Sequence, residues 1–268
     1  RHGLLNSIAA VGHRIVHGGI TYSQPVQLDA GVLSRLERLV PLAPLHQPYN
    51  LDIVRLASSR LPRAVPIGCF DTAFHASRPQ LDRLYALPRN LTDQGLIAYG
   101  FHGLSYAHIA AKLRELEGPR AGGRTIVAHL GSGASMCAMD CGSSIATTMG
   151  FSALDGLVMA TRCGAVDPGM LLHLMTEKDM DAATLSTLLY SQSGLLGVSG
   201  ISGDMQVLLD SNAPQAAEAI DLYVYRAVGV IGSLAARLGG LDSLVFTAGV
   251  GENSPIIRER ICAGARRR

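Results

Sequence analysis

The spacing of apolar and polar positions predicts strands and helices that are mixed from one end of the chain to the other. β-Branched residues from Ile8 to Val16 lead to Gly18 and Gly19, a pattern typical of a strand that ends in a tight turn. A short apolar run from Ala64 to Phe70 predicts a second, buried strand that ends at Asp71. Because strands and helices are interleaved rather than segregated, the pattern indicates an α/β fold class.

Apolar residues recur with helical spacing in several further segments. Two of these segments end before a proline, because the residue before proline disfavours the helical backbone, and one ends at Gly118, a residue type suited to a helix C-cap. The last segment is long and apolar, and we expect it to lie in the core rather than at a subunit interface. The predicted helices span Ala30–Val40, Leu51–Leu61, Ser105–Leu116, Met170–Met175, Ala182–Tyr190 and Ala216–Leu238.

Short strand candidates follow one another in the middle of the chain. Gly131 and Gly133 lie in the turn after the first of them and Gly142 in the turn after the second, which predicts an antiparallel meander. A further buried strand is predicted from Leu244 to Thr247. The members of the meander span Thr125–Leu130, Ala134–Met139 and Ser143–Thr148.

The composition favours a globular protein with small-molecule partners. The 268 residues are 48% hydrophobic, enough to bury one large core or two smaller ones. Glycine and proline cluster from Pro119 to Gly123, which predicts a boundary between a domain of residues 1–120 and a domain of residues 121–268. The 23 basic and 21 acidic side chains nearly cancel, and this argues against a nucleic-acid partner, which needs a broad basic face. The basic run from Arg266 to Arg268 is interpreted as a solvated end.

Two features that the sequence lacks bear on membrane association and on the redox compartment of the protein. No uninterrupted apolar run reaches the roughly 20 residues that cross a bilayer, so we expect no membrane partner. The five cysteines include no C-x-x-C pair, which argues against a cysteine-based zinc or redox site and fits a reducing cytoplasm.

Two segments have the form of an apolar strand followed by a glycine-rich turn. Such turns allow backbone N–H groups to approach phosphate oxygens closely, although most glycine turns after strands are simple hairpins. In the second segment, Asn253 or Ser254 could cap a helix that begins at Pro255, which would place a helix N-terminus beside the turn. The segments are His129-Leu130-Gly131-Ser132-Gly133 and Ala248-Gly249-Val250-Gly251-Glu252-Asn253.

Two acidic residues occupy positions where a ligand contact and a structural role are both open. Asp71 stands at the carboxyl end of a predicted strand, where ligands of α/β proteins bind, but it could equally cap the next turn. Asp204 either contacts a nucleotide or caps the helix that follows it.

Two arginines lie in apolar surroundings and therefore need an acidic partner or an anionic ligand. Arg14 lies inside a strand pattern, and Arg162 precedes Cys163 and Gly164. His102 and His46 lie in turns, where each could contact an anion or stabilise a loop.

His13 and His17 have a spacing that would suit a metal on a helix. Their segment reads as a strand, however, so we expect structural histidines there.

Taken together, these segments resemble the acetate and propionate kinase family, in the right order and along essentially the whole chain. The resemblance implies the actin-like fold of two domains that this family shares with sugar kinases and heat-shock ATPases. The blocks that carry it are HRIVHGG (13–19), APLHQP (43–48), FDTAFH (70–75), YGFHGLSY (99–106), HLGSGAS (129–135), MGFSALDGLVMATRCGAVDPG (149–169), SGLLGVSGISGDM (193–205) and FTAGVGENSPIIRERI (246–261).

The resemblance also implies an activity and a role for each site residue. It implies transfer of a phosphoryl group between ATP and acetate, with Mg²⁺, in a homodimer. Arg14 would bind the substrate carboxylate, while Arg162 and His102 would stabilise the transferring phosphoryl group and Asp71 matches the catalytic aspartate. Because a carboxylate substrate is already ionised, we expect Asp71 to organise magnesium, water or an arginine rather than to remove a proton. The ATP-binding segments would be His129 to Gly133, Asp204-Met205-Gln206, and Gly249 to Asn253.

The chain also departs from the family pattern. Ser132 replaces an asparagine, Ile97 and Ala98 replace two arginines, and Ala146 replaces an acid that could have paired with them. The first family strand, with its Asn/Ser-rich turn, and the last segment, with its magnesium-contacting glutamate, are both missing, so no metal ligand is assigned. The alternatives are therefore a propionate or butyrate kinase, or a catalytically dead nucleotide-binding remnant of the family.

Overall fold

The computed structural model describes residues 7–118 and 123–266. The predicted domain boundary falls largely on residues 119–122 and most of the basic end on residues 267–268, so both lie outside the described residues.

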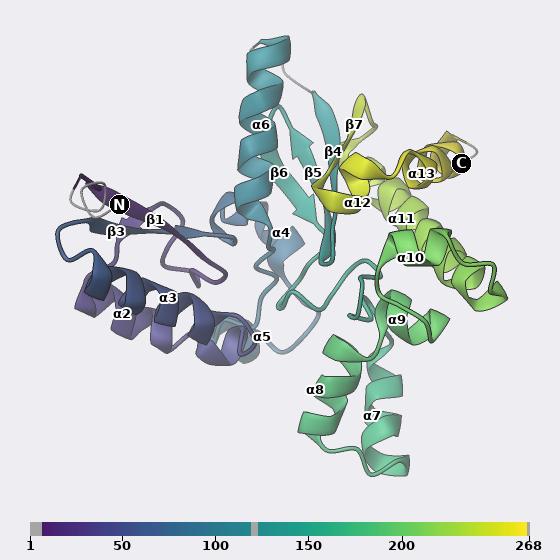
Figure 1. Cartoon of the computed structure of the whole chain (residues 1–268), viewed down its shortest axis with the longest axis horizontal. Coiled ribbons are helices and arrows are strands. Elements are labelled where there is room, and N and C mark those ends of the chain that lie inside the picture. The colour runs from purple at the N-terminus through teal and green to yellow at the C-terminus, as the bar shows by residue number, and fades with distance from the viewer. Residues whose placement is uncertain (1–6, 119–122, 267–268) are drawn as a thin grey trace.

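The N-terminal part contains a small sheet covered on one side by helices. Parallel strands β1 (Ala10–Ile15) and β3 (Val65–Phe70) pair in register, and the short β2 (Val26–Gln27) joins β3 antiparallel. Helices α2 (Ala30–Glu37) and α3 (Gln47–Arg60) lie beside this sheet (Figure 1). Their apolar faces bury a core with the strands that includes Ile15, Leu36, Leu51, Val54 and Phe70.

A larger sheet forms the centre of the molecule, with strand order β6-β5-β4-β7. The predicted meander is confirmed, since β4 (Arg124–Leu130), β5 (Ala134–Asp140) and β6 (Ser143–Thr147) pair antiparallel. β7 (Ser243–Thr247) pairs parallel with β4.

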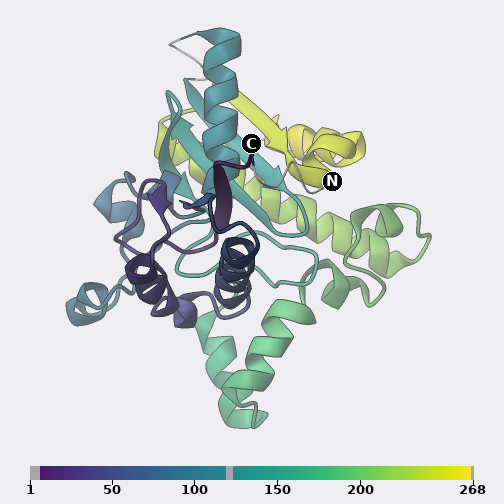
Figure 2. The same cartoon turned by 60° about the vertical axis from the view of Figure 1, so that its left-hand side comes forward.

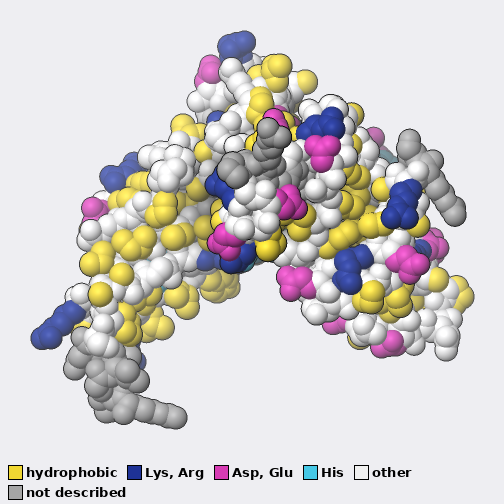
Figure 3. Space-filling model, turned by 90° about the horizontal axis from the view of Figure 1, so that it is seen from above, with side chains coloured by type: hydrophobic (Ala, Val, Ile, Leu, Met, Phe, Trp, Pro, Cys, Tyr) yellow, Lys and Arg dark blue, Asp and Glu magenta, His cyan; other side chains and the backbone are white. Residues whose placement is uncertain are grey.

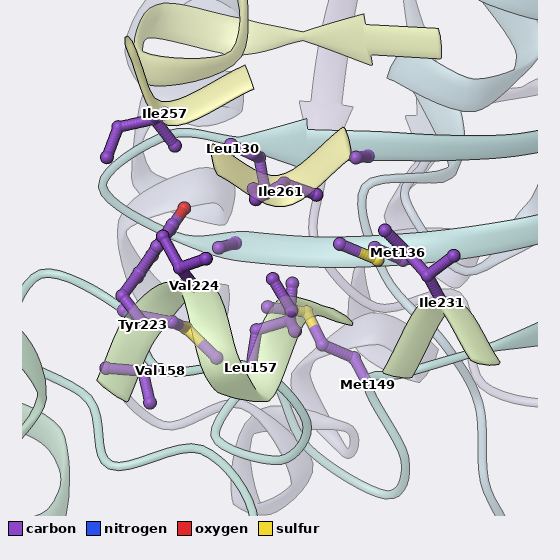
Figure 4. Packing of buried hydrophobic residues seen from close by; sticks show 14 of the residues in the cluster. Leu130, Met136, Met149, Leu157, Val158, Tyr223, Val224, Ile231, Ile257 and Ile261 are labelled. Atoms are coloured by element: carbon purple, nitrogen blue, oxygen red, sulfur yellow. The ribbon is translucent and has the colours of Figure 1, made fainter. Parts of the chain in front are cut away.

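Both faces of the central sheet are covered by other elements. Successive side chains of a strand point to opposite faces, so each strand contributes to two cores. Ile126, Ala128 and Leu130 of β4 pack in a core with α11 (Pro214–Leu238), part of which Figure 4 shows. The intervening Val127 packs on the other face with Tyr106 and Ala110 of α6 (Gly103–Glu117). This double coverage explains why the strand reads as a continuous apolar run.

Shorter elements connect the two sheets and complete the C-terminal part. Helices α7 (Pro168–Glu177) and α8 (Ala182–Ser191) form a hairpin that projects away from both sheets in Figure 1 and Figure 2. The remaining elements are η1 (Val40–Leu42), η2 (Ala73–His75), α4 (Gln80–Arg83), α5 (Arg89–Asp93), α9 (Gly194–Ser199), α10 (Met205–Leu209), α12 (Ala248–Asn253) and α13 (Pro255–Arg266).

Helix α11 confirms the expectation of a core position. Its buried residues include Ile220, Tyr223, Val228 and Ile231. By length and composition alone it could cross a membrane, and within residues 7–118 and 123–266 it is the one helix that could. A helix in the core of a globular protein has the same length and apolar composition, and 44% of the most apolar window of α11 is buried inside the structure.

Two local predictions were wrong. The helix expected from Ala30 to Val40 ends at Glu37, and Pro41 lies in the separate short helix η1. The segment from Ala248 to Asn253, expected as a glycine-rich turn, forms helix α12. Ala248 takes a positive φ of 67°, and Glu252 accepts hydrogen bonds from the Ala248 N–H and the Thr247 hydroxyl. These contacts allow the strand to turn sharply into a helix.

On the face shown in Figure 3, basic side chains are scattered among acidic ones rather than gathered into a patch. That face therefore shows no basic surface of the kind that tracks a nucleic acid.

Candidate active site

Two neighbouring cavities meet at the β4–β5 turn, and most of the predicted site residues line one or the other. We call the first, of about 470 Å³, the cation cavity; its lining includes Arg14, His46, Asp71, His102, His129, Gly131, Ser132, Gly133 and Arg162. We call the second, of about 570 Å³, the glycine cavity; its lining includes Gly131, Ser132, Asp204, Met205, Gln206, Gly249, Val250 and Asn253. Gly131 and Ser132 belong to both.

Arg14 and Asp71 are brought together by the register of the parallel strands. Ile15 pairs with Phe70, so Asp71 emerges beside the end of β1, and its N–H donates to the Ile15 carbonyl. Arg14 Nη2 lies 2.6 Å from Asp71 Oδ2, and Arg14 Nε lies 3.1 Å from both carboxylate oxygens. Asp71 thus engages an arginine, one of the three partners expected for it.

The electrostatics of this pair leave Arg14 available to a ligand. Burial raises the pKa of Asp71, which is 1% exposed, and the hydrogen bond from Arg14 opposes that rise. The same hydrogen bond raises the pKa of Arg14, whose side chain stays 63% exposed at the cavity. Arg14 is therefore a fixed cation held by a buried acid.

Arg162 is a half-buried cation with no carboxylate partner among the described residues. Its Nη1 donates to the Ala153 carbonyl at 2.6 Å, and burial lowers its pKa. A Cβ atom at Gly133 would lie 2.7 Å from Arg162 Nη2, so a side chain at this position would shift the guanidinium from its observed place. An uncompensated, partly desolvated guanidinium is an anion-binding group.

His102 is held in place by a chain of hydroxyl groups. It takes a positive φ of 59° just before α6, and its Nδ1 lies 2.8 Å from Ser135 Oγ, which also contacts the Tyr106 hydroxyl. Its ring stacks on His129 with centroids 4.2 Å apart, and His129 Nδ1 lies 2.9 Å from Ser105 Oγ. Two histidine rings are thereby locked side by side at the cavity.

Burial first, and the neighbouring His129 and arginines second, lower the pKa of His102 to about 2. The imidazole is therefore neutral near pH 7. If Ser135 donates to Nδ1, as the contact with the Tyr106 hydroxyl favours, the proton resides on Nε2. Nε2 would lie 3.4 Å from a Cβ atom at Gly133, so it is directed to the turn and can donate a hydrogen bond to an anion there.

His46 lies at the start of α3, and burial lowers its pKa. It lines both the cation cavity and a small adjoining pocket of about 10 Å³. The walls of this small pocket are mainly apolar and include Val16, Leu45, Phe101 and Ala153.

The glycine cavity is formed by backbone-rich turns and helix ends. Asp204 Oδ1 accepts hydrogen bonds from the Gln206 and Val207 N–H groups, so Asp204 caps α10. The helix cap was one of the two roles predicted for this residue. Gly249 and Val250 belong to α12, and a Cβ atom at Gly249 would meet nothing within 4 Å. The cavity accordingly offers glycine backbone at its wall.

Three predicted nucleotide residues lie outside the lining of both cavities. Leu130 is fully buried in the core, and Gly251 packs against the Phe246 region of β7. The Glu252 carboxylate turns back to Thr247 and Ala248. His129, expected with the nucleotide segments, lines the cation cavity instead.

His13 and His17 are buried as structural side chains in β1 and just after it. Burial lowers the pKa of His17 to about 4, and its ring packs edge-on against Tyr99 and Phe101. Within the described parts of the chain, no three His, Cys, Asp or Glu side chains gather into a possible metal site.

The residues at the positions where the family pattern has charges are buried. Ile97 and Ala146 belong to the large apolar core, and Ala98 is 8% exposed. Ser132 uses its carbonyl to accept a hydrogen bond from the Ala160 N–H at 3.0 Å.

Several supporting residues were missed by sequence reasoning. Ser135 and Tyr106, which orient His102, and Ala153, which holds Arg162, lie in motif blocks but in unremarked positions. A hydroxyl on the buried face of a strand was the available signal for Ser135.

Comparison with protein families matches residues 2–266 to the model described as the Acetokinase family. An acetate kinase of Rhodopseudomonas palustris (strain TIE-1) is 54% identical over 259 residues, which are 96% of this chain and 65% of that protein. An acetate kinase of Rickettsia akari is 48% identical over 96% of this chain and 67% of its own length. The chain thus spans about two thirds of the length of these relatives.

Solved structures give the same result. The crystal structure of an acetate kinase from Porphyromonas gingivalis superimposes with a TM-score of 0.88 at 41% identity, covering 95% of this chain and 65% of the other. A propionate kinase from Francisella tularensis superimposes with a TM-score of 0.94 at 34% identity, covering 99% of this chain and 70% of the other.

Proposed function

The chain belongs to the acetokinase family, and on that premise we propose that it catalyses reversible transfer of the γ-phosphoryl group of ATP to acetate, giving acetyl phosphate and ADP. Its predicted actin-like α/β architecture agrees with the solved relatives. The relatives' names, acetate kinase and propionate kinase, supply the substrate class.

The observation that carries the proposal is Arg162, a cation without an acidic partner among the described residues, which lines the cation cavity beside the shared Gly131–Ser132 turn. Arg14 and the donating Nε2 of His102 face the same space. Phosphoryl transfer depends mainly on positioning and on donors facing the charge spread over the phosphoryl oxygens. Two arginines and a neutral histidine donor supply that set.

In the proposed reaction, a carboxylate oxygen of acetate attacks the γ-phosphorus, and the bond from phosphorus to the β,γ-bridging oxygen breaks as ADP leaves. Arg14 binds the carboxylate, and Arg162 and His102 hold the phosphoryl oxygens. Acetate is ionised near neutral pH, so no general base is required. Asp71 instead fixes Arg14 through two hydrogen-bonded oxygens.

The glycine cavity is the proposed ATP site. Gly131 and Ser132 line both cavities, which would bring the γ-phosphoryl group to the cations while the rest of the nucleotide occupies the glycine cavity. Magnesium would enter as part of MgATP, because the described side chains form no cluster that would hold it alone.

The small pocket next to His46 favours acetate over longer acids. Its volume of about 10 Å³ is close to that of one water-sized group, which suits a methyl group. Propionate and butyrate remain the alternative substrates, since a small shift of side chains enlarges such a pocket. The third alternative is a nucleotide-binding remnant without turnover.

We also propose the division into domains of residues 1–120 and 121–268, a homodimer, and a cytoplasmic location. The five cysteines are free thiols, which fits a reducing compartment. Light scattering after size exclusion tests the dimer.

The test of the function is formation of acetyl hydroxamate from acetate, MgATP and hydroxylamine, with Arg162→Ala as the variant. We expect activity that the variant lowers about a hundredfold or more, with ATP binding retained. ATP binding without product would favour the remnant; equal activity with propionate or butyrate would contradict the preference for acetate.

A further inference from the structure

Tyr223 presents a buried hydroxyl that has no hydrogen-bond partner among the described residues. The residue is 3% exposed, and it lines the glycine cavity together with Asp204, Met205 and Val250. A buried hydroxyl without a partner is costly, because folding removes its hydrogen bonds to water and returns none. A molecule bound in the cavity could supply the acceptor that this hydroxyl lacks.

The ring of Tyr223 packs among apolar side chains. It lies in the cluster that contains Leu130, Val158 and Ile257, as Figure 4 shows. Burial raises the pKa of this phenol, so the hydroxyl keeps its proton and acts as a donor. The cations lie elsewhere, since Arg14 and Arg162 line the other cavity.

This apolar packing favours the nucleoside half of a nucleotide over its phosphate half next to Tyr223. A phosphate carries charge that is costly to bury among apolar side chains, whereas the neutral base and sugar are far cheaper to desolvate. We propose that the Tyr223 hydroxyl donates a hydrogen bond to an acceptor on the nucleoside half of the bound nucleotide, and so acts as a specificity-determining residue. This inference rests on the proposed function, because it takes the glycine cavity as the nucleotide site.

Tyr223→Phe tests the proposal because it removes the hydroxyl and keeps the ring. Calorimetric titration would measure the Kd of ADP and of inorganic triphosphate for the parent and the variant. We expect the variant to bind ADP about 3- to 10-fold more weakly and triphosphate with unchanged Kd. Tyr225→Phe is the matched control, since Tyr225 lies on the same helix and is 64% exposed; its ADP affinity should equal that of the parent.

Stability without ligand gives a second readout. If the hydroxyl has no internal partner, Tyr223→Phe should have a Tm equal to or above that of the parent. A clear loss of Tm would overturn the proposal, because it would reveal a partner within the protein. Unchanged ADP affinity, or equal weakening of ADP and triphosphate, would overturn it as well. A parent that binds no nucleotide would instead overturn the proposed function, and this inference with it.

Discussion

Acid should destabilise this protein well above the pH at which its carboxylates titrate, because several histidines are buried in the neutral form. Burial is the largest cause in each case, and it lowers the pKa of His17 to about 4, of His75 to about 3 and of His102 to about 2. His75 shows why protonation is resisted: it is fully buried, with Nδ1 2.8 Å from Ser144 Oγ and Nε2 3.0 Å from the Phe101 carbonyl.

The sign follows from proton binding in the two states. The folded-state pKa lies below the unfolded value of about 6.5, so the stability contribution is complete above that value and is lost as the pH falls towards each folded pKa. Lowering the pH from about 7.5 to about 5.5 protonates these histidines in the unfolded chain only. Each one then costs about 1.4 kcal/mol, and the three together about 4 kcal/mol. Asp71 and Asp155, whose pKa values burial raises, act in the opposite direction on further acidification.

Urea unfolding at several pH values, followed by circular dichroism, measures this loss. His75→Gln should show a pH-dependent loss about 1.4 kcal/mol smaller than that of the parent. His108→Gln is the control, because His108 is exposed on α6, and its loss should match that of the parent. A free energy of unfolding that changes by less than about 1 kcal/mol between the two pH values would refute the reasoning.

Other predictions concern the site and the backbone. Arg14→Ala should raise the KM for acetate and lower the free energy of unfolding by about 1 to 2 kcal/mol, because it leaves Asp71 buried without its partner; the loss is moderate because water screens the exposed Arg14. Adding Asp71→Asn should restore part of the stability. Full stability of Arg14→Ala alone would contradict the prediction. Ser135→Ala should lower kcat about tenfold with the Kd of ATP unchanged, because His102 loses the partner of Nδ1; an unchanged kcat would remove that role. Gly229→Ala should raise the free energy of unfolding by about 0.5 to 1 kcal/mol, since a Cβ atom at this position in the middle of α11 meets nothing within 4 Å. Gly194→Ala should destabilise by more than that gain, because φ is +64° and the new Cβ atom would lie 2.2 Å from the Met159 carbonyl oxygen. Thermal unfolding of the two glycine variants, side by side, checks both signs.

Much of the fold could be predicted because it is encoded in local patterns. Alternation and glycine turns located the β4–β5–β6 meander, and helical spacing located α11. Where a local signal had two readings, sequence reasoning failed: the glycines of residues 248–253 suggested a turn, but the long-range placement of β7 and the Glu252 cap produced a helix.

Part of the candidate site could also be predicted. The sequence placed Asp71 at the end of a strand and required partners for Arg14 and Arg162, because burial of unpaired charge is costly. It did not indicate which partner each arginine has. That depends on strand register in the case of Arg14 and on the absence of a nearby acid, among the described residues, in the case of Arg162.

The sequence by itself therefore determined the α/β class, the order of the elements, the family blocks and the residue types available for chemistry, since all of these follow from local periodicity and motif order. Only the tertiary structure decided that Arg14 is held by Asp71, 57 residues away, that His102 is neutral, and that the Tyr223 hydroxyl lines a cavity without a partner among the described residues. The physical reason is that pairing, desolvation and cavity lining depend on contacts between segments distant in the chain, which no local pattern contains.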